Sequence, residues 1–131
     1  MQFLSDEWAD SYTALLNEDP TIQKKLKRFS AMFSYEVSDK EEIETLVIEV
    51  KKGKCISYGA ITAYNAKDVE FSMSSDSQTW QKIFDKEISI KEALHSKNFL
   101  LAGPKLKALS NKSGLEKSVT LMLDMQDVVV S

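Results

Sequence analysis

The sequence predicts an α+β domain in which helices at both ends of the chain flank a group of β-strands. Three observations support this class. Apolar residues recur at helical spacing in residues 5–28 and again after residue 76, whereas residues 29–74 alternate between apolar and polar side chains. Short polar segments divide the alternating region into four strands. A fifth apolar run, Phe99–Ala102, lies between two later helical segments.

Composition restricts the classes of protein that the chain can be. Its 131 residues suit one domain (residues 1–131) with its own core. A formal net charge of −3 argues against nucleic acid as a partner. Cys55 is the only cysteine and His95 the only histidine, which excludes an intrachain disulfide and a Cys/His zinc site. With no membrane-length apolar run and no signal-peptide pattern, we expect a cytoplasmic protein with at most transient membrane contact.

Two helices are expected near the N-terminus. Ser5 is a typical N-cap residue, and acidic residues follow it directly. The helix is expected to end near Asn17, and its apolar stripe consists of Trp8, Tyr12, Leu15 and Leu16. Asp19-Pro20 has the cap-then-proline order of a second helix, with Ile22 and Leu26 on one face.

Four strands are predicted in the alternating region, at residues 29–37, 46–51, 55–62 and 69–74. The third strand alternates weakly, which predicts that it is covered on both sides. Because short polar turns separate consecutive strands, we expect all four to form an antiparallel meander.

The segment after the fourth strand contains two helix signals and one strand signal. Asp76 or Ser77 is expected to cap a helix, and Ser89 with Glu92 has the spacing of a capping box. Phe99–Ala102 is apolar throughout, as a buried strand can be. A further helix is expected after Gly103-Pro104.

The C-terminal region permits two interpretations. Residues 113–116 repeat the capping-box spacing, and the stripe of Leu115, Val119 and Met122 predicts a helix to about Gln126. Residues 119–125 also alternate, so a strand is the alternative. Residues 128–130 are expected to form an apolar tail that either docks or frays.

Two sequence blocks resemble segments of the sterol carrier protein 2 family. Val69–Ser74 is similar to the family's strand before a helix, here a helix that begins near Asp76. Lys91–Leu106 is similar to the family's short helix, turn, strand and following glycine, with Ala93 and Gly103 in matching places. The resemblance covers about residues 5–112 and leaves residues 113–131 as a C-terminal helical extension.

This resemblance implies a five-stranded, mostly antiparallel sheet with helices covering one face and an apolar cavity between the layers. It also implies a non-catalytic lipid-binding or lipid-transfer protein, whose ligand is a hydrophobic small molecule such as a fatty acid, a fatty acyl-CoA, a sterol-like molecule or another lipid. No cofactor is implied. Independently, a sheet with one apolar face must be covered, and incomplete coverage leaves an apolar pocket.

Candidate pocket residues come from the inward faces of the strands and from the helices expected to close the cavity. They are Phe33, Phe71, Met73, Trp80, Phe84, Leu101, Leu106, Leu109, Met122 and Met125. The alternative for each is that it packs in an ordinary core. The methionines are the most informative, since flexible thioethers adapt to varied ligand shapes.

No residue pattern predicts catalysis or a metal site. His95 has no carboxylate placed beside it by the sequence, and Cys55 has the apolar neighbours of a structural cysteine. An acyl-group enzyme is therefore the least favoured function. The lysines at 105, 107, 112 and 117 either meet an anionic headgroup or membrane surface or serve only solubility, and we favour solubility.

A second function is kept beside the lipid carrier. In it, the same fold has a cavity filled by its own side chains and acts through protein–protein contacts or as a homodimer. The apolar residues of the C-terminal tail motivate this alternative, because they could plug the cavity or form a dimer interface.

Overall fold

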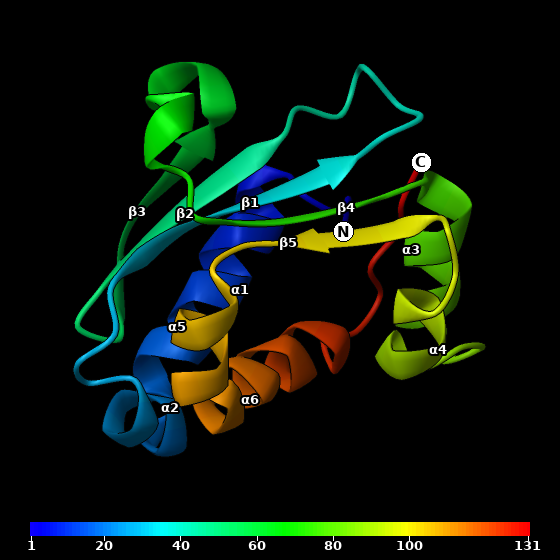
Figure 1. Ribbon diagram of the computed structural model, residues 1–131. Coiled ribbons are helices and arrows are strands. Elements are labelled where there is room, and N and C mark those ends of the chain that lie inside the picture. The colour runs from blue at the N-terminus through cyan, green and yellow to red at the C-terminus, as the bar shows by residue number, and fades with distance from the viewer.

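The computed structural model describes residues 1–131 and confirms the α+β class. A five-stranded sheet has six α-helices on one of its faces, below the sheet in Figure 1. The helices are α1 (Asp6–Glu18), α2 (Pro20–Lys25), α3 (Ser77–Phe84), α4 (Ile90–Leu94), α5 (Lys105–Ser110) and α6 (Lys112–Leu123). The strands are β1 (Ala31–Val37), β2 (Leu46–Lys51), β3 (Lys54–Ala60), β4 (Phe71–Ser75) and β5 (Phe99–Ala102).

The strand order is β3-β2-β1-β4-β5, so β1 lies in the centre of the sheet. Strands β1, β2 and β3 form the expected meander, but the prediction that β4 continues it is wrong. The chain crosses back and β4 pairs in parallel with the other side of β1, with Phe33 opposite Phe71 and Tyr35 opposite Met73. This position buries Phe71 and Met73 beside the central strand, whereas an extension of the meander would place them beside the exposed edge strand β3.

Both edge strands are more exposed than predicted. No residue of β3 is fully buried, so it is not covered on both sides, and it ends at Ala60. In β5 only Phe99 is buried, because this strand pairs with β4 alone and lies beyond the helices that cover the centre of the sheet. The apolar run therefore predicts the strand β5 correctly, but it does not predict how much of that strand is buried.

Local capping signals are mostly confirmed. The side chains of Ser5, Asp19 and Asp76 each accept a hydrogen bond from the first turn of their helix. Ser89 and Glu92 form the complete capping box. The second capping box is wrong, because α6 begins at Lys112 and Ser113 lies inside its first turn. Residues 119–123 are helical, which decides between the two interpretations of this region.

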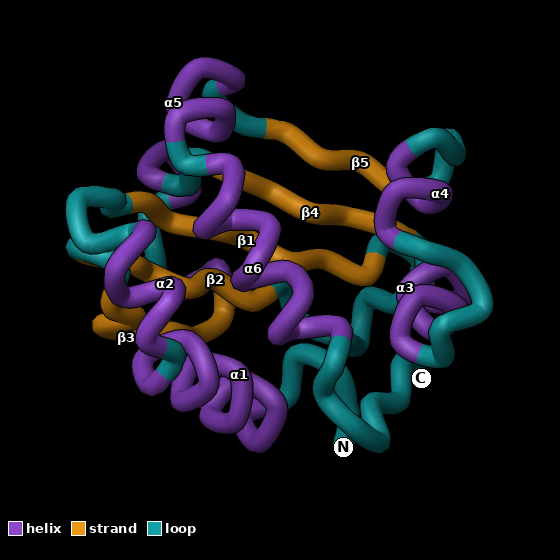
Figure 2. The backbone as a smooth tube through the Cα atoms, turned by 90° about the horizontal axis from the view of Figure 1, so that it is seen from below, coloured by secondary structure: helices purple, strands orange, loops and turns teal.

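The chain termini meet beside α3. Of the two outcomes left open for the tail, the structure shows docking, since Val128 and Val130 are buried and Val129 pairs with Gln2 in a parallel β-bridge. The Gln81 side chain holds the tail from both sides, donating to the Val128 carbonyl at 3.1 Å and accepting from the Val130 amide at 2.8 Å. Figure 2 shows both ends of the chain beside α3 on the helical side of the sheet.

Gly103 is expected to be irreplaceable. Its φ is +154°, and a Cβ atom there would lie 2.3 Å from Cδ1 of the buried Phe71 ring. Gly103→Ala should lower the free energy of unfolding by about 2–4 kcal/mol through backbone strain and overpacking. Urea denaturation checks this, with the exposed neighbour Ala102→Ser as the control. Equal stability of the two variants would contradict the expectation.

Candidate functional site

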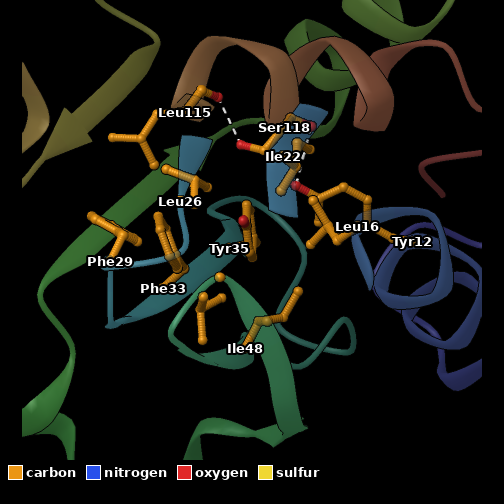
Figure 3. A pocket seen from close by; sticks show the side chains of 12 residues that line it. Tyr12, Leu16, Ile22, Leu26, Phe29, Phe33, Tyr35, Ile48, Leu115 and Ser118 are labelled. Atoms are coloured by element: carbon orange, nitrogen blue, oxygen red, sulfur yellow. Dashed lines mark hydrogen bonds between the residues drawn. The ribbon is translucent and has the colours of Figure 1, made fainter. Parts of the chain in front are cut away.

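A small apolar cavity lies between the helices α1, α2 and α6 and the strands β1 and β2. Its volume is about 20 Å³, room for about one water molecule. Ten of its twelve lining residues are hydrophobic. The lining consists of Tyr12, Leu16, Ile22, Leu26, Phe29, Phe33, Tyr35, Ile48, Val50, Gly53, Leu115 and Ser118 (Figure 3).

Periodicity brings these side chains together. On α1, Tyr12 and Leu16 are four residues apart and face the sheet. On β1, Phe33 and Tyr35 are two residues apart and point to the helical side. Leu115 approaches from α6, so that the helical wall and the sheet wall meet around the cavity. The site is therefore the seam between the two layers of the fold.

The cavity contains two buried phenol groups in its apolar lining. The Tyr12 hydroxyl donates to the Ser118 carbonyl at 3.2 Å, and the Ser118 hydroxyl donates to the Leu115 carbonyl at 2.7 Å. Burial raises the pKa of Tyr12 to about 12. Burial also raises the pKa of Tyr35 well above its ordinary value. Both side chains are therefore neutral hydrogen-bonding groups at physiological pH.

A further polar group is buried close to these tyrosines. The Trp8 ring is fully buried, with its centroid 5.1 Å from that of Tyr12 and 6.3 Å from that of Tyr35. Its Nε1–H group is buried without any hydrogen-bond acceptor in the chain. An unsatisfied buried donor costs about 1–3 kcal/mol, and this one lies beside the cavity without being part of its lining.

Polar side chains close the end of the cavity beside the β2–β3 turn. The Gln23 amide donates to the Leu16 and Gly53 carbonyls, both at 2.9 Å. Asn17 donates to the Cys55 carbonyl at 3.2 Å and accepts from the Cys55 amide at 2.8 Å. These bonds fasten the first two helices to β3 and its turn, beside the end of the cavity that Gly53 lines.

Of the ten predicted pocket residues, only Phe33 lines this cavity. Phe71, Met73, Trp80, Phe84 and Met122 are buried in the core, and Met125 is half-buried against it. Leu101, Leu106 and Leu109 are exposed. Trp80 has a structural role, because its Nε1 donates to the Glu36 carbonyl at 2.9 Å and fastens α3 to β1.

Most of the cavity lining was missed, although part of its signal is present in the sequence. Tyr12 and Leu16 belong to the apolar stripe of the first helix, and Ile22 and Leu26 to that of the second. Each stripe marks a buried face, but neither says which of the other elements that face meets. Ser118 carries no apolar signal at all.

The single histidine and the single cysteine lie outside the cavity. His95 is exposed at the end of α4. Cys55 is half-buried on β3, and burial raises the pKa of its thiol to about 11, which keeps it protonated at neutral pH. None of the six α-helices combines the length and hydropathy needed to cross a bilayer.

Comparison with known proteins identifies the class to which this fold and seam belong. The profile of the SCP-2 sterol transfer family matches residues 12–127, so the chain belongs to this family. Membership supports a lipid-binding or lipid-transfer role in general terms. No curated protein matches the sequence significantly.

Solved structures share the fold at low sequence identity. A crystal structure of sterol carrier protein 2 aligns with a TM-score of 0.74 and 17% identity, covering 94% of this chain and 98% of the other. A protein of Thermus thermophilus, described as possibly a sterol carrier protein, aligns with a TM-score of 0.67 and 17% identity over 95% and 90% of the two chains.

The same fold also occurs inside a larger protein. The sec-alkylsulfatase Pisa1 from Pseudomonas sp. aligns with a TM-score of 0.53 and 14% identity, covering 86% of this chain but only 16% of the sulfatase. The fold is therefore found both as most of a small protein and as a minor part of an enzyme.

The buried tyrosines predict a loss of stability at alkaline pH. Above pH 10 the unfolded chain releases phenolic protons that Tyr12 and Tyr35 retain in the folded state, so unfolding becomes easier as the pH rises. The raised pKa of Tyr12 alone should lower the free energy of unfolding by about 1 kcal/mol between pH 9 and pH 11. Urea denaturation across this range checks it. Tyr35→Phe should reduce the pH dependence of the free energy of unfolding. Tyr64→Phe, outside the cavity, is the control variant.

Gly114 lies where α6 packs closely against Leu26 at the end of α2, so we expect a larger residue there to be destabilising. A Cβ atom there would lie 2.5 Å from Cδ2 of Leu26, which lines the cavity. Gly114→Ala should therefore lower the free energy of unfolding by about 1–3 kcal/mol, even though alanine favours helices. Urea denaturation measures the change, and Glu116→Ala on the exposed side of α6 is the control. A gain in stability would show that α6 has room to move outward.

Proposed function

We propose that the protein binds a hydrophobic ligand between its helical layer and its sheet and transfers it without catalysing a reaction. A fatty acid, a fatty acyl-CoA or a sterol-like lipid fits the chemistry of the site. The observation that carries this proposal is the apolar cavity at the seam, with its buried tyrosine hydroxyls, in a member of the SCP-2 sterol transfer family. We further propose that this carrier works in the cytoplasm.

Binding requires the seam to widen. Pockets for ligands of this size usually enclose about 300–1,000 Å³, far more than the 20 Å³ present here. Gln23 and Asn17 fasten the elements beside the β2–β3 turn, so the wall that we expect to move is α6, at the cost of the bond from the Tyr12 hydroxyl to the Ser118 carbonyl. Burying about twelve methylene groups contributes roughly 10 kcal/mol, which can offset the displacement of this helix.

The polar groups of the seam suit a ligand with an oxygen-bearing end. Tyr35 and Tyr12 supply neutral hydroxyls, and Trp8 Nε1 lacks an acceptor. A hydroxyl or carbonyl oxygen placed beside Trp8 would accept its unsatisfied N–H bond. A purely hydrocarbon ligand would leave this donor unpaired and so bind less tightly.

The neighbouring chemistry supports a carrier without its own reaction. The raised pKa of Cys55 keeps its thiol protonated, and the exposed His95 lies outside the cavity. Neither side chain therefore forms an activated nucleophile with a base.

Native mass spectrometry followed by organic extraction tests the proposal. The expected result is a co-purifying lipid, whose mass gives the ligand class. Leu115→Trp should fill the cavity and reduce ligand occupancy at least tenfold, because the added ring occupies the ligand's space. Thr120→Trp on the exposed side of the same helix is the matched control. Equal occupancy in both variants would place the ligand elsewhere.

The alternative is an interaction module whose core is filled by its own side chains. The small volume of the cavity favours it, because this cavity has no room for a lipid without movement of its walls. In that case added fatty acids leave the melting temperature unchanged, and Leu115→Trp changes only stability. Sedimentation equilibrium then tests for a homodimer, which this function requires if its partner is a second copy.

A further inference from the structure

One border of the molecule combines exposed leucines with lysines. Helix α4, strand β5 and helix α5 lie along the same edge in Figure 2. We call this surface the leucine–lysine border. Its residues are Lys91, Leu94, Lys97, Leu100, Leu101, Lys105, Leu106 and Leu109.

The leucines of the border are unusually accessible. Leu100 is 64% exposed, Leu101 57%, Leu106 81% and Leu109 66%. Leu101 shares the face of Met73 and Leu100 that of Ser74, so the two leucines stand on opposite faces of the edge strand. Leu106 and Leu109 are three residues apart on one face of α5. The leucines thus surround the edge of the sheet, and the cavity between the layers does not include them.

The charge around these leucines is opposite to that of the whole chain. The protein has a net charge of −3, yet no acidic residue occurs between Glu92 and Glu116. Lys97 and Lys105 lie in this acid-free segment and form no ion pair in the structure, whereas Lys91 precedes the segment and is followed by the exposed Glu92. Lys107 differs from them, because its ammonium group is already paired with the Glu70 carboxylate at 2.9 Å. The free cations therefore alternate along the chain with the exposed leucines.

We propose that the leucine–lysine border docks on the surface of an anionic phospholipid bilayer, with its leucines entering the headgroup region and its lysines facing lipid phosphates. Protruding apolar side chains flanked by cations have the chemistry that such a surface binds. This docking does not depend on what the seam between the layers holds.

Two other occupants fit the border less well. Peptides and helices usually bind in a groove, whereas these leucines protrude from an edge. A symmetric dimer through the same border would bring lysines of one copy against those of the other. A bilayer that carries negative charge meets both the shape and the charge of this border.

Vesicle flotation of the full chain tests the proposal. We expect binding to phosphatidylcholine vesicles that contain phosphatidylglycerol at about 30 mol%, and much weaker binding to phosphatidylcholine alone. Sodium chloride at about 0.5 M should release the protein, because it screens the lysines. Absence of binding to the anionic vesicles would overturn the proposal, whatever ligand the seam is found to hold.

Two pairs of variants locate the contact. Leu106→Glu with Leu109→Glu should weaken vesicle binding at least tenfold, whereas Leu15→Glu with Ile56→Glu adds the same charge at exposed sites elsewhere and should weaken it less. Lys97→Gln with Lys105→Gln should weaken it about fivefold per lysine. Lys24→Gln with Lys27→Gln, in the basic segment at and just after the end of α2, is the matched control. Equal losses in test and control pairs would overturn the assignment.

Light scattering separates docking from dimerisation. The expected result is a monomer in both the wild type and the leucine variant. A dimer that dissociates in Leu106→Glu with Leu109→Glu would assign the border to a second copy of the chain and overturn the bilayer proposal. Circular dichroism and the melting temperature confirm that each variant is folded, and the exposure of the substituted side chains favours this.

Discussion

One aromatic cluster joins the two groups of helices under the sheet. The centroid of the Phe3 ring lies 4.9 Å from that of Trp8 on α1, and 4.8 Å and 5.0 Å from those of Trp80 and Phe84 on α3. All four side chains are buried. Helices α1, α2 and α6 cover one end of the sheet and α3 with α4 the other, so Phe3 closes the space between the groups. The position of the seam in turn depends on α1 being held in this way.

Features that depend on neighbouring residues could be predicted from the sequence. A cap such as Ser5 or Asp19 bonds within its own helical turn, so the side chain and its partner are visible in a few letters. Alternation likewise predicts β1 and β2, because each residue's face depends only on the pleat. The class of fold and the family follow from the order of such elements.

Features that depend on distant partners could not be predicted in this way. The parallel pairing of β4 with β1 depends on a crossover that local turns do not reveal. The exposure of Leu101 depends on how far the helical layer extends across the sheet, while its own segment is uniformly apolar. The cavity has the same character, since Tyr12 and Leu115 are about a hundred residues apart in the chain.

The bridge between Gln2 and Val129 has a consequence for the order of events in folding. The Phe3 amide donates a hydrogen bond to the Val129 carbonyl at 2.8 Å, so a core residue near the start of the chain receives its acceptor from the tail. A ribosome that is still making α6 holds a chain whose N-terminal aromatic residues lack this partner. The nascent chain therefore leaves the Phe3 amide without its acceptor until the tail emerges, although the ring's partners on α1 and α3 are made earlier.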